Sequence, residues 1–215
     1  MPMIRSTTPC LLGVLFVLSG CSGESKPVKF CGKLHQPDET LVECKESHYT
    51  NIEALKELKK LEHLDISNTG ISRLDPLSGS LKLKTLNVAN TKVDSLGKLK
   101  ELRSLTYLNV SRTNLRNLDG VEAMERLMNV SAKFLPGTDL SPLKPLKHLV
   151  ELELDGWGDK DGLDIKPLFD LKSLRKVSLY DTPTRARDIS ELKRLNPNLR
   201  VVGCDGHDST PCKAD

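Results

Sequence analysis

The residues of this chain that could do chemistry are mainly cysteines, and four of the six lie after residue 21. Cys31 and Cys44 lie toward one end of the remaining chain, and Cys204 and Cys212 lie at the other. An apolar N-terminus is typical of exported proteins, and an even number of cysteines in such a chain predicts disulfides. Cys204 and Cys212 could instead bind a metal ion together with His207, but the neighbouring sequence offers no obvious fourth ligand. We therefore predict two disulfides and no metal site.

The segment DGWGDKDGLD (155–164) is the second candidate, because it combines four aspartates, three glycines and the only tryptophan of the chain. Carboxylates separated by glycine turns can bind calcium. The EF-hand pattern fails here, because Trp157 stands where the first carboxylate of the loop should be. We favour a tight turn that directs Trp157 into the core. The alternatives are a calcium site and a Trp157 side chain that contacts a partner at the rim of the fold.

The rest of the composition favours binding over catalysis. No Ser-His-Asp spacing, phosphate-binding glycine loop or paired zinc motif is present, and the five histidines are scattered along the chain. Lys and Arg number 32 against 29 Asp and Glu, a balance that argues against nucleic-acid binding. We predict a protein that is not an enzyme and needs no cofactor.

A hydrophobic pattern with a 22-residue period must position all of these groups. In three consecutive coils the repeated positions are Leu64, Ile66, Thr69, Ile71, Leu74 and Leu77; Leu86, Val88, Thr91, Val93, Leu96 and Leu99; and Leu108, Val110, Thr113, Leu115, Leu118 and Val121. This period predicts an α/β solenoid in which each coil adds a short parallel strand and a short helix or 3-10 turn. Two later coils, from Leu152 to Val177 and from Val177 to Val202, should each exceed the period by three. The buried threonine hydroxyls should bind loop backbone amides.

The ends of the stack should be closed by disulfides. Stepping back one 22-residue period from Leu64 and Ile66 gives Val42 and Cys44, so an N-terminal cap (31–57) is already in phase with the repeats (58–203). About seven coils spaced by about 4.8 Å place the two ends roughly 30 Å apart. A disulfide needs Cα atoms within about 7 Å, so only Cys31–Cys44 and Cys204–Cys212 remain, the second in a C-terminal cap (204–215).

The repeat from about Val42 to Val202 resembles that of bacterial leucine-rich repeat proteins, especially the 22-residue class of internalin-like surface proteins. The resemblance implies a curved right-handed solenoid with a parallel sheet on the concave face and short helices or 3-10 turns on the convex side. Such a face usually binds proteins, so the resemblance implies a protein partner and, we expect, a monomer.

The N-terminus predicts export and a lipid anchor. Residues 1–20 contain one charge, Arg5, before an apolar run that is too short to span a bilayer. The ending Leu-Ser-Gly-Cys21 resembles the bacterial lipobox, which implies a lipid on Cys21 and a polar tether over residues 21–30. Ser22 stands where an aspartate is associated with retention in the inner membrane, so we expect a cell-envelope protein of the outer membrane. The alternative is ordinary cleavage near Gly20, which releases a soluble protein.

Outward strand positions should form the binding face, because they need not serve the core. Tyr107 and Tyr180 are candidate anchors among few aromatic residues, and Glu151, Glu153 and Asp155 form an acidic patch that could meet a basic partner. The predicted partner-binding residues are Tyr107, Asn109, Lys133, Glu151, Glu153, Asp155, Trp157 and Tyr180. Two other functions stay open. One is an assembly role through the convex face, and the other is glycan binding on Tyr107, Trp157 and the outward asparagines.

Overall fold

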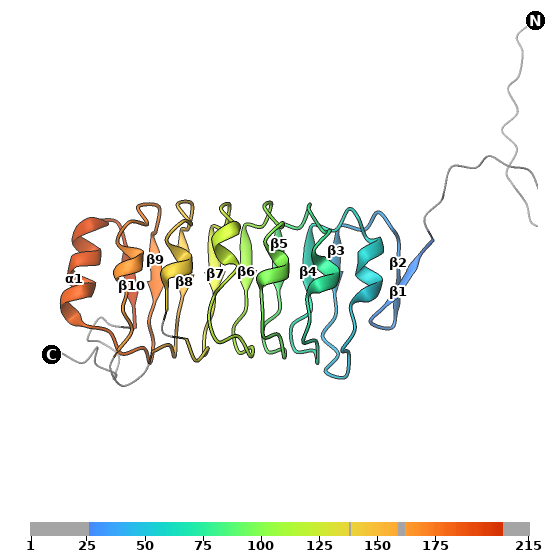
Figure 1. The fold of residues 1–215 in the computed structure, drawn as a ribbon, viewed down its shortest axis with the longest axis horizontal. Coiled ribbons are helices and arrows are strands. Elements are labelled where there is room, and N and C mark those ends of the chain that lie inside the picture. The colour runs from blue at the N-terminus through green and yellow to red at the C-terminus, as the bar shows by residue number, and fades with distance from the viewer. Residues whose placement is uncertain (1–25, 138, 159–161, 204–215) are drawn as a thin grey trace, which may run out of the picture.

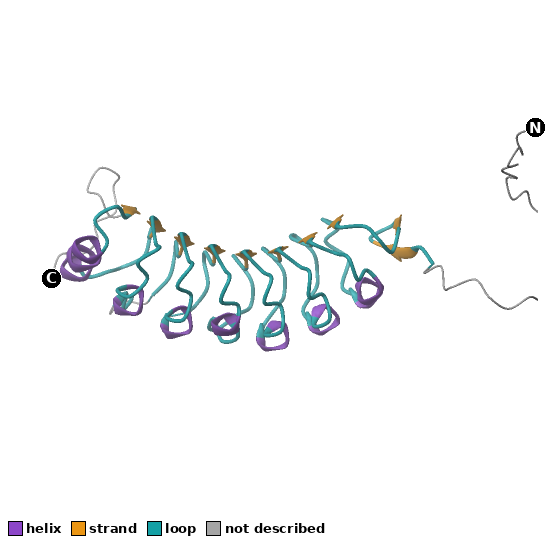
Figure 2. Cartoon of the chain, turned by 90° about the horizontal axis from the view of Figure 1, so that it is seen from above, coloured by secondary structure: helices purple, strands orange, loops and turns teal. Residues whose placement is uncertain are grey.

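The computed structural model describes residues 26–137, 139–158 and 162–203, and its main feature is one curved parallel sheet. Eight strands of three residues each follow one another in chain order across the sheet. They line the inner side of an arc, and the helical turns line its outer side (Figure 1, Figure 2). The strands are β3 (Leu41–Glu43), β4 (His63–Asp65), β5 (Thr85–Asn87), β6 (Tyr107–Asn109), β7 (Asn129–Ser131), β8 (Glu151–Glu153), β9 (Lys176–Ser178) and β10 (Arg200–Val202).

The convex side consists of short 3-10 turns, as the sequence predicts, and one α-helix in the last coil. Proline early in three of these turns fits the first residues of a helix, where no amide partner is lost. The 3-10 turns are η1 (Glu53–Glu57), η2 (Asp75–Leu77), η3 (Gly97–Leu99), η4 (Val121–Ala123), η5 (Ser141–Leu143) and η6 (Lys166–Leu168), and the helix is α1 (Ala186–Leu195). The predicted leucine-rich repeat solenoid is therefore confirmed.

The strand register follows the 22-residue period until the last two coils. Leu64, Leu86 and Leu108 are direct neighbours across β4, β5 and β6. Leu152 pairs with Val177, so this coil exceeds the period by three, as predicted. The prediction for the next coil is wrong, because Val177 pairs with Val201 rather than Val202. Val201 is buried and Val202 is half-buried. The sequence pattern could not distinguish these two adjacent valines, and the register depends on which of them points into the core.

The threonines that follow the strands are buried, and the Thr182 hydroxyl accepts a loop amide as predicted, from Trp157 at 3.3 Å, but the hydroxyls of the three earlier threonines do not. Thr69, Thr91 and Thr113 donate instead to backbone carbonyls three residues earlier, at 2.7, 2.7 and 2.8 Å. Nearby loop amides are already used, since Asn68 N donates to the Ala89 carbonyl of the next coil at 2.9 Å. The hydroxyl therefore satisfies an acceptor inside its own coil.

The N-terminal cap is larger than predicted. An antiparallel hairpin of β1 (Val28–Phe30) and β2 (Lys33–His35) packs over the first coil. Phe30 is fully buried, with its ring centroid 5.0 Å from that of Tyr49, so the last three residues of the predicted tether belong to the fold. Their apolar residues cover the open end of the stack.

The Cys31–Cys44 disulfide is present, with Cα atoms 5.7 Å apart. Cys44 is 2 % exposed, as expected for an inward position in phase with the repeats. The predicted signal peptide, the lipid site at Cys21 and the second pair, Cys204 with Cys212, lie outside the described residues, as does His207. In the described part of the chain, no helix is long and apolar enough to cross a membrane.

Candidate binding surface on the concave face

The first residues of the strands form a column across the concave face, and two of its members are apolar and exposed. Leu41 on β3 is 56 % exposed, and Tyr107 on β6 is 37 % exposed. Between them lie His63 and Thr85, whose side chains are joined by a hydrogen bond of 2.9 Å between Nδ1 and Oγ1. Since parallel register places these four side chains side by side, they form a continuous strip over β3–β6.

This strip borders a hollow of about 320 Å³ in the N-terminal half of the concave face. Leu41 and Tyr107 lie at its two ends, and Glu43 and Asp65 supply carboxylates. Exposed apolar and aromatic groups around a concave, partly charged floor are typical of a surface that receives a partner's side chain. The hollow is thus the best-formed candidate site on this face.

The last residues of three strands, β4, β5 and β6, bind the backbone rather than pointing freely outward. Asp65, Asn87 and Asn109 each accept a hydrogen bond from the amide two residues later, at 2.9, 3.1 and 3.0 Å. This local bond turns the chain at the strand end, which explains why Asp or Asn recurs at this position. Asn109, a predicted contact residue, therefore has a structural role as well as a half-exposed side chain.

The charge of Asp65 at this strand end can be tested through the pH dependence of the protein's stability. Burial by itself would raise the pKa of the Asp65 carboxyl, but hydrogen bonds from Ser67 and the Lys45 ammonium 3.5 Å away hold it below its usual value of 3.8. A lowered pKa means that ionised Asp65 stabilises the fold above pH 3.8, and that this contribution is lost as the pH falls through the lower, folded-state pKa.

The variant Asp65→Asn keeps the acceptor for the Ser67 amide and removes only the charge. We expect it to be less stable than the parent chain above about pH 5, with the difference shrinking as the pH falls through the folded-state pKa of Asp65, which lies below 3.8. Urea unfolding followed by circular dichroism at several pH values measures this difference. A difference that stays constant over the whole range contradicts the assignment.

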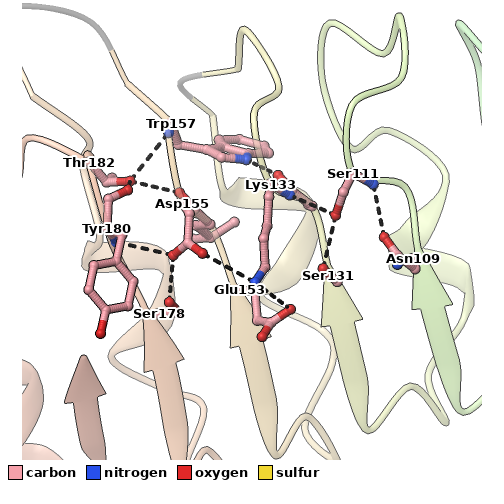
Figure 3. Close-up of polar contacts among 12 residues, drawn as sticks. Asn109, Ser111, Ser131, Lys133, Glu153, Asp155, Trp157, Ser178, Tyr180 and Thr182 are labelled. Atoms are coloured by element: carbon pink, nitrogen blue, oxygen red, sulfur yellow. Dashed lines mark hydrogen bonds and ion pairs between the residues drawn. The ribbon is translucent and has the colours of Figure 1, made fainter. Parts of the chain in front are cut away.

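In the C-terminal half of the face, the predicted acidic patch contains a lysine (Figure 3). Lys133 Nζ lies 3.2 Å from Glu153 Oε2 and 3.3 Å from Asp155 Oδ2. Burial alone would lower the pKa of the Lys133 ammonium, but its hydrogen bonds to Glu153 and Asp155 raise it above the ordinary value. The expectation of an unbalanced acidic patch is therefore wrong, and Glu151 itself lies opposite Lys176 in the strand register.

Asp155 is a buried structural residue rather than a free surface carboxylate. It is 7 % exposed, and its Oδ1 accepts hydrogen bonds from Ser178 Oγ and, at 3.1 Å, from the Tyr180 amide (Figure 3). Ser67 and Ser111, at the same position of earlier coils, are also buried. At this position, two residues after the strand, the burial of Asp155 contradicts the prediction that it is free to bind a partner, whereas Tyr180 of the next coil is exposed.

Trp157 points into the core, as the favoured interpretation of its loop predicts. Its side chain is fully buried, and its indole N–H donates to the Ala132 carbonyl of the preceding coil. Its inclusion among the partner-binding residues, and with it a glycan platform on Trp157, is therefore wrong. Among the described residues, no three His, Cys, Asp or Glu side chains are grouped so as to hold a metal ion. Residues 159–161, which include two of the four loop aspartates, lie outside the described part.

Tyr107 and Tyr180 keep the exposure that the prediction requires, at 37 % and 43 %. They lie in different coils and at different positions of the repeat, so they do not form one site. Lys133, Glu151 and Glu153 are half-buried on the same face as Tyr180. The candidates therefore divide into a hollow with Tyr107 and a self-paired polar cluster next to Tyr180.

Leu41 and Phe134 are among the exposed apolar residues that the sequence did not mark as functional candidates. Leu41 could have been found by stepping back one 22-residue period from His63 to an outward position that should not be apolar. Phe134 is 44 % exposed and has a left-handed backbone (φ 56°), which is rare for a bulky residue. The Arg112 guanidinium lies 4.0 Å from its ring centroid, and a Cβ at Gly156 would come within 2.6 Å of the ring. Gly156 thus makes room for Phe134 in the row of turns.

Comparison with known proteins supports the fold. A family profile described as "Leucine Rich repeats (2 copies)" matches residues 59–101. No curated protein matches the chain significantly. Internalin C2 of Listeria monocytogenes has a similar structure, with a TM-score of 0.59, 26 % identity, and coverage of 64 % of this chain and 59 % of that chain.

A second internalin of Listeria monocytogenes gives a TM-score of 0.61 at 21 % identity over 74 % of this chain and 52 % of its own. A plant peptide hormone receptor, solved in complex with its hormone, gives 0.54 at 13 % identity over 70 % of this chain and 25 % of its own. The chain thus matches about half of each internalin and a quarter of the receptor. Its repeat pattern and parallel concave sheet form a leucine-rich repeat solenoid, which is similar in fold to the bacterial internalins.

Proposed function

We propose that this protein is a non-catalytic, lipid-anchored module of a bacterial cell envelope that binds a protein partner in the N-terminal hollow of its concave face. Leucine-rich repeats typically serve as protein interaction modules, and one structural neighbour is a receptor solved with a peptide hormone. The lipid anchor rests on the Leu-Ser-Gly-Cys21 pattern, and the outer membrane on Ser22.

The single observation that carries the proposal is the hollow between Leu41 and Tyr107. Both side chains are exposed beside a floor that includes Glu43 and Asp65. Because burying apolar area drives association, these two residues have most to gain from a partner. The polar cluster of Lys133, Glu153 and Asp155 has less to offer, since its charged groups already satisfy one another.

The partner of this hollow should present an apolar side chain next to a basic one. An apolar group fits beside Leu41 and Tyr107, and an ammonium or guanidinium complements the two carboxylates and can lie over the tyrosine ring. This pairing predicts a protein or peptide segment rather than a sugar, because a neutral glycan would bring no opposite charge to Glu43, whereas Asp65 already pairs with Lys45.

The test compares two doubly substituted proteins expressed in bacteria. Leu41→Ser with Tyr107→Ala removes both apolar ends of the hollow, and Lys98→Ala with Lys100→Ala changes the convex side as a control. Proteins that co-isolate from envelopes with the parent chain are quantified by mass spectrometry. We expect the control variant to retain a partner protein whose recovered amount falls about thirtyfold with the hollow variant. A loss of this size is typical when interface hot spots are removed. Loss from the convex variant alone contradicts the proposal and favours an assembly role through that side.

A further inference from the structure

The turns that precede the strands form a continuous edge of the solenoid, here called the strand-start edge. In this edge each coil donates a backbone amide to the coil before it: Lys84 to Glu62, Thr106 to Lys84, Met128 to Thr106, Val150 to Met128 and Arg175 to Val150, at 2.7, 2.8, 2.9, 2.7 and 2.8 Å. This ladder keeps equivalent residues of successive coils about 4.8 Å apart. The edge comprises residues 59–62, 81–84, 103–106, 125–128, 147–150 and 172–175.

The strand-start edge is strongly basic although the whole chain is nearly balanced. Its six segments hold nine lysines and arginines against two glutamates, whereas the full chain has 32 basic and 29 acidic residues. The third residue of every segment is a buried leucine, which directs the others outward. The nine basic residues are Lys59, Lys60, Lys82, Lys84, Arg103, Arg126, Lys147, Lys172 and Arg175, and all are exposed.

Most of these cations have no acidic partner. Lys84 pairs with Glu62, and Arg175 donates to two backbone carbonyls. Lys60, Lys82 and Lys147 form no ion pair within the part of the chain that the structure describes. The opposite edge, made by the turns that follow β4–β9, is close to neutral over the segments 67–70, 89–92, 111–114, 133–136, 155–158 and 180–183. The positive charge thus belongs to one edge rather than to the surface as a whole.

The shape of the edge limits what it can contact. The solenoid curves in the plane that Figure 2 shows, and the turns at both ends of the strands lie in level rows in Figure 1. The backbone of the strand-start edge is therefore level, and its basic surface includes a hollow of about 450 Å³ lined in part by Arg126, Met128 and His148. The edge has no Phe, Tyr or Trp in its six segments. Single-stranded nucleic acids need such rings for stacking, so a flat anionic surface is the better match.

We propose that the strand-start edge docks on the anionic headgroups of a lipid membrane. Each lysine or arginine near such a surface adds to the attraction, which is screened within about 8–10 Å at physiological salt. Docking in this way stands the strands upright on the membrane and leaves the concave hollow open to the side. The inference does not depend on what binds the hollow, and a basic face would reinforce a lipid at Cys21.

The test is lysine footprinting of the full chain reconstituted into vesicles and recovered with them by flotation. One set of vesicles is pure phosphatidylcholine, and the other also contains phosphatidylglycerol. On the anionic vesicles we expect an amine-acetylating reagent to modify Lys60, Lys82 and Lys147 at least about tenfold more slowly than on pure phosphatidylcholine. The convex Lys98, Lys100 and Lys144 should react equally on both, and high salt should restore the edge lysines.

A charge-reversal pair provides matched variants. Lys60→Glu, Lys82→Glu and Lys147→Glu together should restore the reactivity of Lys59 on anionic vesicles, whereas the same changes at Lys98, Lys100 and Lys144 should not. The parent-chain comparison stands even if the first variant does not fold. The proposal is overturned if Lys60, Lys82 and Lys147 react equally on the two kinds of vesicle, whether they are reactive on both or protected on both. Protection by soluble polygalacturonate but not by anionic vesicles assigns the edge to a linear polyanion instead and also overturns it.

Discussion

Replacement of Trp157 by alanine is expected to lower the free energy of unfolding by about 3–5 kcal/mol. Trp157 is fully buried and connects three coils. Its indole N–H donates to Ala132 of the preceding coil, and its backbone amide donates to Thr182 Oγ1 of the following coil at 3.3 Å. A Cβ at Gly137 would lie 2.6 Å from the ring, so the surrounding chain is already closely packed on it. Truncation leaves a large cavity and an acceptor without its donor.

Urea unfolding followed by far-ultraviolet circular dichroism measures this loss without relying on tryptophan fluorescence. Trp157→Phe should cost less, because it keeps much of the packed ring and loses only the indole hydrogen bond. Tyr180→Ala is the control for an exposed aromatic residue in the neighbouring coil, and a change within about 0.5 kcal/mol is expected there. If Trp157→Ala behaves like Tyr180→Ala, Trp157 is a surface residue and the assignment to the core is wrong.

Removal of the Cys31–Cys44 disulfide is the second change with a large expected effect. The two cysteines are separated by 13 positions in sequence, and for a loop of this size the chain-entropy account gives about 3 kcal/mol of stability. Since Cys44 is also a buried core position next to the hairpin of β1 and β2, the loss should loosen the cap that covers the first coil.

The double variant Cys31→Ala with Cys44→Val isolates the cross-link, because valine keeps an apolar side chain of similar size in the core. We expect its urea midpoint to fall and the amides of residues 28–44 to exchange hydrogen faster than those of β6 and β7. Reduction of the parent chain is less specific, since it also acts on any bond between Cys204 and Cys212. An unchanged midpoint together with unchanged exchange in the cap contradicts the structural role of this disulfide.

The features that the sequence predicted are those repeated in phase. The leucine ladder, the parallel strands, the 3-10 turns and the inward Cys44 all follow from one period, because a solenoid repeats the same local environment in each coil. Cys31–Cys44 followed from the distance between the ends of the stack. The hairpin whose turn contains Cys31 lies outside the periodic region, so no repeated position marked Phe30 as a buried residue.

The candidate site was only partly predictable, because alternation gives the direction of a side chain but not its partners. Asp155 alternates outward and yet bonds to Ser178 and Tyr180 of the next coil. Lys133 reaches two acids of the next coil in the same way. Composition alone predicts an acidic patch here, but the acidic residues already bind groups of neighbouring coils. Leu41 was recoverable from the 22-residue register.

The measurement that tests the central claim most directly is site-specific photo-crosslinking in native bacterial envelopes. The photoreactive residue replaces Tyr107 at the hollow, Tyr180 at the far part of the concave face, or Lys98 on the convex side. We predict a discrete crosslinked protein from the Tyr107 position, a weaker product or none from Tyr180, and none from Lys98. A discrete product from Lys98 with none from Tyr107 contradicts the account, because the protein would then meet its partner through the convex side.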